Sequence, residues 1–218
     1  MCGRYSLATP AEELVETFDV PALTFHQAPR YNIAPGQDAL VVAADRRGRR
    51  MGLLRWGLVP SWADGPARRS INARSETVRS SASFREAFAA RRCLVPADGF
   101  FEWRGEGSGK VPYWFHPVDG RVLALAGIWE RWAPPGHDPY HGFSVLTVES
   151  NDDVMEVHPR MPALLDPSVW AEWLSGDTPL DKVQSLLAPA RAGTLLRHVV
   201  SARVNATAND DPGLVESV

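Results

Sequence analysis

The residue with the most distinctive chemistry is Cys2, which directly follows Met1. A residue this small normally permits removal of Met1. Removal would leave an α-amine with a pKa of about 8 beside a thiol with a pKa of about 8.5. Such an aminothiol condenses with an aldehyde: the amine forms an imine, and the thiol then closes a five-membered thiazolidine ring. The same pair suits acyl transfer with the amine as base, and a chance cysteine at a frayed terminus explains Cys2 equally well.

Two further candidates, Glu102 and His158, lie in apolar or constrained sequence. Aromatic residues flank Glu102 within residues 98–103, and such surroundings raise the pKa of a carboxyl toward the range of a general acid. His158 is held by the proline that follows it. The simpler alternatives are a solvent-facing glutamate on an amphipathic strand and a structural histidine.

A polar cluster, residues 72–76, follows a tryptophan-rich stretch, and arginines alternate with tryptophans over much of the chain. Cations that contact phosphates and flat rings that stack on bases together suit single-stranded nucleic acid. The 8 tryptophans are explained equally by a core. Only 2 of the 23 basic residues are lysines, so few side-chain amines compete with an α-amine at Cys2.

Composition limits the classes of protein. A chain of 218 residues with 44% hydrophobic and 22% charged residues predicts one globular domain over residues 1–218. Neither a membrane span nor a signal peptide is recognisable, and 2 cysteines indicate a reducing compartment, so we expect a cytoplasmic protein and, from its size, a monomer. No zinc-type spacing, phosphate-binding loop or dinucleotide motif is present, so we expect no metal and no cofactor. A net charge of −3 argues against non-specific nucleic-acid affinity as the main property.

The pattern of elements is α+β, with mostly antiparallel sheets and attached helices. Capping boxes at residues 9–12 and 83–86, and N-caps at Asp166 and Thr178 that precede prolines, predict helices. Short β-branched or aromatic runs predict strands at residues 40–43, 51–59, 93–95, 100–103, 113–116, 123–129 and 143–148. The Asn- and Asp-rich tail, residues 206–218, is compatible with disorder and with an edge of the fold.

Together, these stretches resemble the SRAP family of SOS-response-associated peptidases, also described as abasic-site processing proteins. Seven blocks match in the family's order: residues 1–5, 30–35, 56–62, 72–77, 91–103, 126–130 and 158–162. The departures, Gly36, Phe101 and Pro159, remove no group that the chemistry needs. The resemblance implies the SRAP fold, in which mostly antiparallel sheets form a barrel-like core with flanking helices.

The resemblance also implies a DNA-damage protein, associated with the nucleoid when bound to DNA, that captures abasic sites in single-stranded DNA. The Cys2 amine would form a Schiff base with the sugar aldehyde, and its thiol would close a thiazolidine crosslink. By the same resemblance, Glu102 is the general acid–base, His158 steadies the opened sugar and Asn72 holds Cys2 by a hydrogen bond. The implied DNA contacts are Arg4, Arg74, Ser75, Trp103 and Arg160.

Three other functions stay open at this point. Class II glutamine amidotransferases also begin Met-Cys-Gly, although the later blocks do not match them. A cysteine peptidase would use Cys2, His158 and Glu102 as nucleophile, base and orienting group, with removal of Met1 as its mildest activity. The resemblance also implies a lyase activity at abasic sites. A non-covalent single-strand binding module would bind in a salt-sensitive way, with no preference for lesions.

Overall fold

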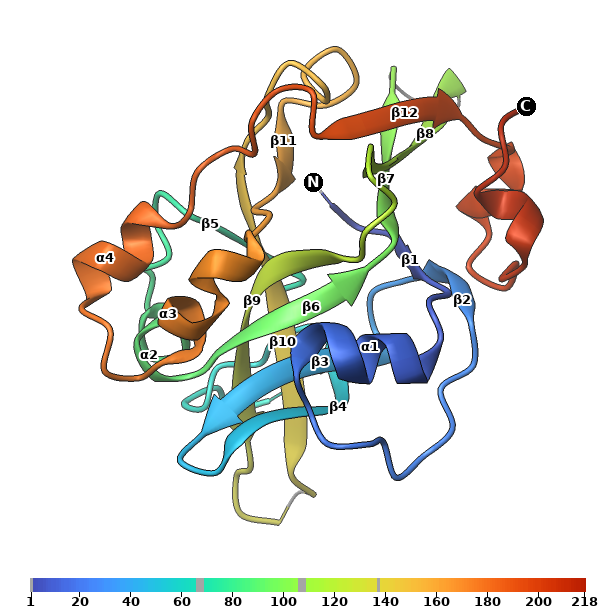
Figure 1. The fold of residues 1–218 in the computed structure, drawn as a ribbon. Coiled ribbons are helices and arrows are strands. Elements are labelled where there is room, and N and C mark those ends of the chain that lie inside the picture. The colour runs from blue at the N-terminus through green and yellow to red at the C-terminus, as the bar shows by residue number, and fades with distance from the viewer. Residues whose placement is uncertain (1, 66–68, 106–108, 137) are drawn as a thin grey trace.

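The computed structural model describes residues 2–65, 69–105, 109–136 and 138–218. Met1, whose removal the sequence predicts, lies outside these residues. Two β-sheets with a few short helices at their edges make up the fold (Figure 1). The smaller sheet has the strand order β12 (Leu195–Val199), β8 (Val111–Pro117), β7 (Gly99–Arg104), β1 (Tyr5–Leu7), β2 (Arg30–Ile33).

The larger sheet closes on itself. Its order is β11 (Arg160–Pro162), β10 (Tyr140–Glu149), β4 (Gly48–Trp56), β3 (Asp38–Asp45), β6 (Arg92–Ala97), β9 (Leu123–Trp132). Because β9 also pairs with β10, the strands from β10 to β9 form a ring. Strand β10 runs parallel to β4 and to β5 (Asn72–Arg74), while the other described strand pairs are antiparallel. The predicted α+β, barrel-like core is confirmed.

The interior of the ring explains the apolar runs of the sequence. Every residue of β6 is buried, because the ring covers one face of the strand and helices cover the other. Closure needs a glycine at position 127 of β9, where a Cβ atom would lie 2.8 Å from the sulfur of Cys93. The ring of Trp56 packs between Tyr5 and Phe143, with centroid distances of 5.1 and 6.2 Å. This stack joins β1 of the smaller sheet to the barrel.

The helices form where the sequence predicts them: α1 (Ala11–Phe18), α2 (Arg85–Ala90), α3 (Trp170–Leu174) and α4 (Leu180–Ser185). The expected caps of α1, α2 and α4 are wrong, since none of these helices has a side-chain cap. The Thr9 hydroxyl donates to Asp98 at 2.5 Å instead of capping α1. Asp166 does act as predicted, and accepts from the Ser168 amide in the 3₁₀ turn before α3.

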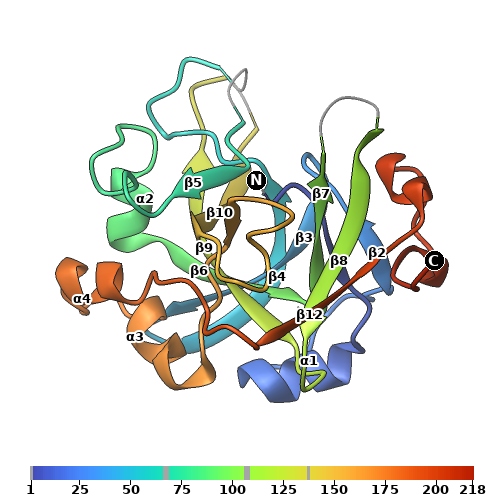
Figure 2. The ribbon, with the colours of Figure 1, turned by 90° about the horizontal axis from the view of Figure 1, so that it is seen from above.

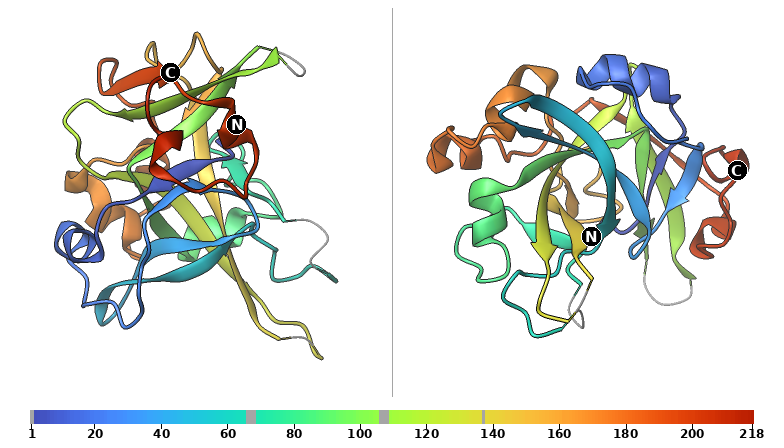
Figure 3. Two further views of the ribbon diagram at one scale, coloured as in Figure 1. Left: turned by 90° about the vertical axis from the view of Figure 1, so that its right-hand side faces the viewer. Right: turned by 90° about the horizontal axis from the view of Figure 1, so that it is seen from below.

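The seven predicted strands are all found, and each extends beyond the predicted bounds by one to three residues at one or both ends. Strands β1, β2, β5, β11 and β12 were not predicted. The strand expected at residues 51–59 ends at Trp56, because Gly57 has a φ of 140°, a conformation that only glycine adopts without strain. The tail is not detached: residues 212–214 form a 3₁₀ turn, Ser217 bridges to Val200, and the segment lies beside β2 (Figures 1 and 3). No helix in the described ranges is long and apolar enough to cross a membrane.

Candidate functional site

The start of the described chain lies between the two sheets, with β7 on one side and β5 and β10 on the other (Figure 2). Cys2 is fully buried there, and its sulfur is 4.0 Å from the main-chain oxygen of Arg4. Burial, and then the negative charge of Glu102, raise the pKa of the Cys2 thiol far above its ordinary value. The resting thiol is therefore protonated at neutral pH, and a nearby base must accept its proton before the sulfur can react.

Glu102 provides a carboxyl group close to Cys2. It lies on β7 opposite Tyr113 of β8 and is only 2% exposed. Burial raises its pKa to about 7. A carboxyl group with this pKa is present in both protonation states at neutral pH, as acid–base catalysis requires. The predicted perturbation of Glu102 by apolar surroundings is thus found, and burial is its main cause.

His158 lies in the loop between β10 and β11, and its Nδ1 is 3.9 Å from Oε1 of Glu102. The same Nδ1 is 3.0 Å from the main-chain nitrogen of Arg160 and 2.9 Å from its oxygen. These contacts fix the orientation of the ring. Burial lowers the pKa of His158, so the ring is mainly neutral at pH 7. The structure therefore brings Cys2, Glu102 and His158 together, from three separate parts of the chain.

Asn72 is the first residue of β5 and lies opposite Val145 of β10. Both polar atoms of its side chain are buried and have no hydrogen-bond partner among the described residues. The predicted bond to Cys2 is accordingly not formed between described atoms, since the thiol contacts Arg4 instead. An unpaired buried amide costs about 1–3 kcal/mol of stability, so its presence here points to a ligand that completes it.

This geometry predicts that Asn72→Leu stabilises the protein, raising the free energy of unfolding by about 1–3 kcal/mol, because an apolar group of similar size replaces an unpaired amide. Denaturant unfolding measures the change. The matched control is Asn151→Leu: the Asn151 amide donates to Asp153, Ala190 and Arg191, so its loss is expected to destabilise. Destabilisation by Asn72→Leu would show that this amide is bonded in the folded protein.

The predicted DNA-contact residues differ in how far they are already engaged. Arg160 makes a two-pronged ion pair with Glu76, at 2.6 and 3.0 Å, and also donates to Thr147. Ser75 is 6% exposed, and its carbonyl accepts a bond from α4. Arg74, at the end of β5, is exposed, and its guanidinium has no partner in the part of the chain that the structure describes.

Arg4 and Trp103 face the C-terminal segment instead. The Nη1 atom of Arg4 donates to Asn32 at 2.7 Å and to the Val204 carbonyl at 2.6 Å. Its guanidinium lies 5.8 Å from the ring centre of Trp103, whose indole nitrogen donates to Asn205. No role was predicted for Asn32, although a polar residue in the apolar half of a short strand is a signal that could have identified it.

No group of three or more His, Cys, Asp or Glu residues within the described ranges is arranged to hold a metal ion. The groups that the residues named above bring to the site are a thiol, a carboxyl, an imidazole and an amide.

Known proteins match this chain along its whole length. Residues 1–207 match the family described as "SOS response associated peptidase (SRAP)". The chain is 36% identical to abasic site processing protein YoqW of Bacillus subtilis, with 100% of both chains covered, and 34% identical to YoaM of the same organism, with 100% and 98% covered. A solved structure from Bacteroides thetaiotaomicron has the same fold, with a TM-score of 0.89, 24% identity and full coverage of both chains.

Proposed function

The chain belongs to the SRAP family, and from this premise we propose that it captures abasic sites in single-stranded DNA through a covalent bond to Cys2. Relatives that are 30–36% identical over their full length carry the name abasic site processing protein. The observation that carries the proposal is the grouping of a buried Cys2, a carboxyl with a pKa of about 7 and His158 at 3.9 Å from that carboxyl.

The proposed reaction conserves its atoms. After removal of Met1, the α-amine of Cys2 attacks the C1′ aldehyde of the opened sugar, and loss of one water gives an imine. The thiol then adds to the imine carbon, its proton passes by way of Glu102 to the nitrogen, and a thiazolidine results. Protonated Glu102 assists loss of water, and ionised Glu102 accepts the thiol proton. The neutral ring of His158 steadies the sugar oxygen.

Asn72 and Arg4 complete the proposed site. The unpaired amide of Asn72 can donate to the sugar or accept from the Cys2 amine. We therefore expect Asn72→Leu, which stabilises the fold, to slow capture. Arg4 is half-buried, and among the described residues it has no carboxylate beside it and forms hydrogen bonds through Nη1 alone, so part of its guanidinium remains to contact a phosphate.

A cysteine peptidase with a preformed thiolate–imidazolium pair fits this geometry less well. Such a pair lowers the pKa of the thiol, whereas burial and Glu102 raise it here. The Nδ1 atom of His158 contacts the main chain of Arg160 and the carboxyl of Glu102. We therefore assign peptidase chemistry no more than the removal of Met1.

The test is a denaturing gel of the purified protein with three single-stranded oligonucleotides: intact, abasic, and abasic with the aldehyde reduced to an alcohol. We expect a slow band with the abasic strand alone, and an intact mass equal to the sum of protein without Met1 and DNA, less one water. Absence of this band, with removal of Met1 established, would contradict the proposal. Ammonia release from glutamine would then support the amidotransferase alternative.

Arg74 is proposed to contact a phosphate because its guanidinium is exposed and has no partner among the described residues. Arg74→Gln is expected to weaken binding to single-stranded DNA and to reduce the slope of log affinity against log salt by about 0.7, the value for one lost phosphate contact. Fluorescence anisotropy at several salt concentrations measures both. The control is Arg79→Gln on the same segment, because Arg79 is already paired with Asp181 at 2.6 Å. Equal slopes for the two variants would exclude the contact.

A further inference from the structure

A polar cluster at the C-terminal segment lies outside the chemistry proposed above. Asn32, on β2, is fully buried, and its amide nitrogen donates to three carbonyl oxygens of that segment, those of Val204, Ala206 and Asn209, at 2.8–3.2 Å. Its amide oxygen accepts from Arg4 at 2.7 Å. One buried side chain thus links the C-terminal segment to a residue two positions after Cys2.

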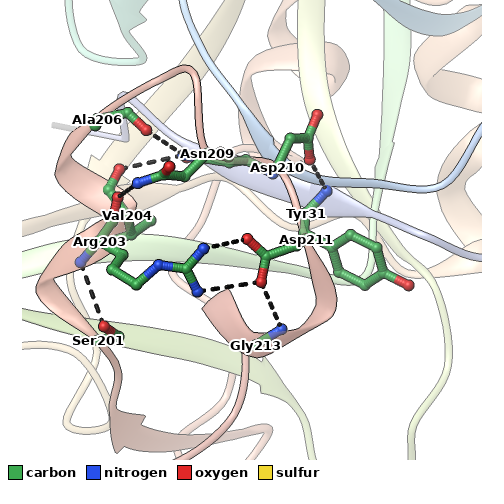
Figure 4. Close-up of polar contacts among 10 residues, drawn as sticks. Tyr31, Ser201, Arg203, Val204, Ala206, Asn209, Asp210, Asp211 and Gly213 are labelled. Carbon is green, nitrogen blue, oxygen red and sulfur yellow. Dashed lines mark hydrogen bonds and ion pairs between the residues drawn. The ribbon is translucent and has the colours of Figure 1, made fainter.

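The segment is fastened to β2 by a second set of bonds, shown in part in Figure 4. The carboxylate of Asp210 accepts from the main-chain nitrogens of Tyr31 and Asn32, at 2.5 and 3.0 Å, and pairs with Arg30 at 2.5 Å. The turn is stiffened internally, because the Arg203 guanidinium pairs with Asp211 and the amide of Asn209 donates to the Arg203 carbonyl (Figure 4). The carbonyl oxygens that Asn32 contacts are therefore held in place.

Arg4 connects this cluster to the reactive cysteine. Residues 2–4 precede β1, so strand pairing does not fix them. Two anchors at Arg4 hold them: its carbonyl accepts from the Phe101 amide at 2.9 Å, and its guanidinium is bound by Asn32 and Val204. The same carbonyl is the contact of the Cys2 thiol. A change at Asn32 therefore reaches Cys2 through one residue.

We infer that Asn32 and residues 201–211 form a clamp on Arg4 that fixes the position of Cys2, with Asn32 as a positioning residue. The clamp also touches β7, because Asn205 accepts from Trp103, the neighbour of Glu102. That the clamp assists DNA capture rests on the proposed function. That the clamp holds Cys2 in place is independent of the proposed function and can be measured without DNA.

The experiment measures how fast iodoacetamide alkylates each cysteine of the full chain, by peptide mass. Cys2 and Cys93 are both fully buried, so Cys93 serves as an internal control within each sample. We expect Asn32→Ala to increase the alkylation rate of Cys2 about tenfold, as local opening allows, with no change at Cys93. Arg4→Met should do the same, and keeps the test decisive if Asn32→Ala does not fold.

The matched control is Arg121→Gln, which also breaks an exposed arginine–aspartate ion pair, that to Asp119 at 2.7 Å, but lies outside the clamp. It should protect Cys2 as the wild type does. Unchanged protection of Cys2 in the variant that folds, equal gains at both cysteines, or a matching gain in Arg121→Gln would overturn the inference. A wild type that forms no DNA adduct would contradict the proposed function alone, because the alkylation ratio still decides the clamp.

Discussion

Cys2→Ala is expected to abolish the denaturation-resistant adduct with abasic single-stranded DNA, leaving only background. Alanine keeps the α-amine but lacks the sulfur that closes the ring, so any imine that forms is hydrolysed on denaturation. The structure makes this loss easy to interpret, since Cys2 is a small buried group whose one described bond is a weak contact to the Arg4 carbonyl. The readout is the fraction of labelled oligonucleotide in the slow band at a fixed time.

Treatment with borohydride separates the two chemical steps. Reduction converts an imine into a stable amine, so Cys2→Ala should give a band when borohydride is present and none when it is absent. The control is Cys93→Ala, which removes the other buried thiol, on β6 inside the barrel, and should form the adduct as the wild type does. A full-strength adduct from Cys2→Ala without borohydride would place the bond at another residue and reject the ring closure.

The sequence predicted the fold well where local chemistry decides it. Apolar runs bounded by Gly, Pro and Asp lie on strands, and the helices begin within a few residues of the expected sites. The cap of α1 was predicted wrongly because the Thr9 hydroxyl, which the capping box requires, donates to a distant residue, Asp98. The parallel pairing of β10 with β4 and β5 depends on how remote segments meet, which no local pattern encodes.

In the candidate site, too, the residue types were predictable from the sequence and the long-range contacts were not. The residue types of Cys2, Glu102 and His158 indicated their chemistry, and the structure brings them together. The engagement of Arg4 by Asn32, and of Arg160 by Glu76, was not predictable, because each bond joins residues 28 or 84 positions apart. A family resemblance identifies the arginines but does not say which of them already has a partner.

Glu102→Gln is expected to stabilise the protein at high pH. The pKa of Glu102 is raised from 4.5 to about 7, so the folded state binds its proton more tightly than the unfolded state does. Stability from this group is present below pH 4.5 and is lost as the pH rises through 7. Above pH 7 the wild type therefore carries a cost of about 3 kcal/mol that the neutral glutamine lacks. Denaturant unfolding at pH 4 and pH 8 measures the difference, which should be near zero at the lower pH.

The same Glu102→Gln substitution is expected to slow capture of abasic DNA by about 10²-fold or more, the usual contribution of a positioned acid–base group. Glutamine keeps the shape of the side chain but neither donates the proton that assists loss of water nor accepts the thiol proton. The rate of capture by the wild type should change its dependence on pH near pH 7, where Glu102 titrates between its protonated and ionised forms. The rate of capture by the variant should show no such change.

Glu149→Gln is the matched control for this prediction, because it removes the same charge from an exposed position at the end of β10. It should capture at the wild-type rate and keep the pH dependence near 7. Wild-type kinetics in Glu102→Gln would remove Glu102 from the mechanism. A slow variant that retains the break near pH 7 would assign that break to another group, of which His158, at 3.9 Å, is the nearest titratable candidate with a described distance. Substitution of Glu102 is thus expected to raise stability and lower the rate of capture, as is substitution of Asn72. The reason is the same at both positions: a buried amide without a described partner and a buried carboxyl cost stability in the folded protein but serve the proposed reaction.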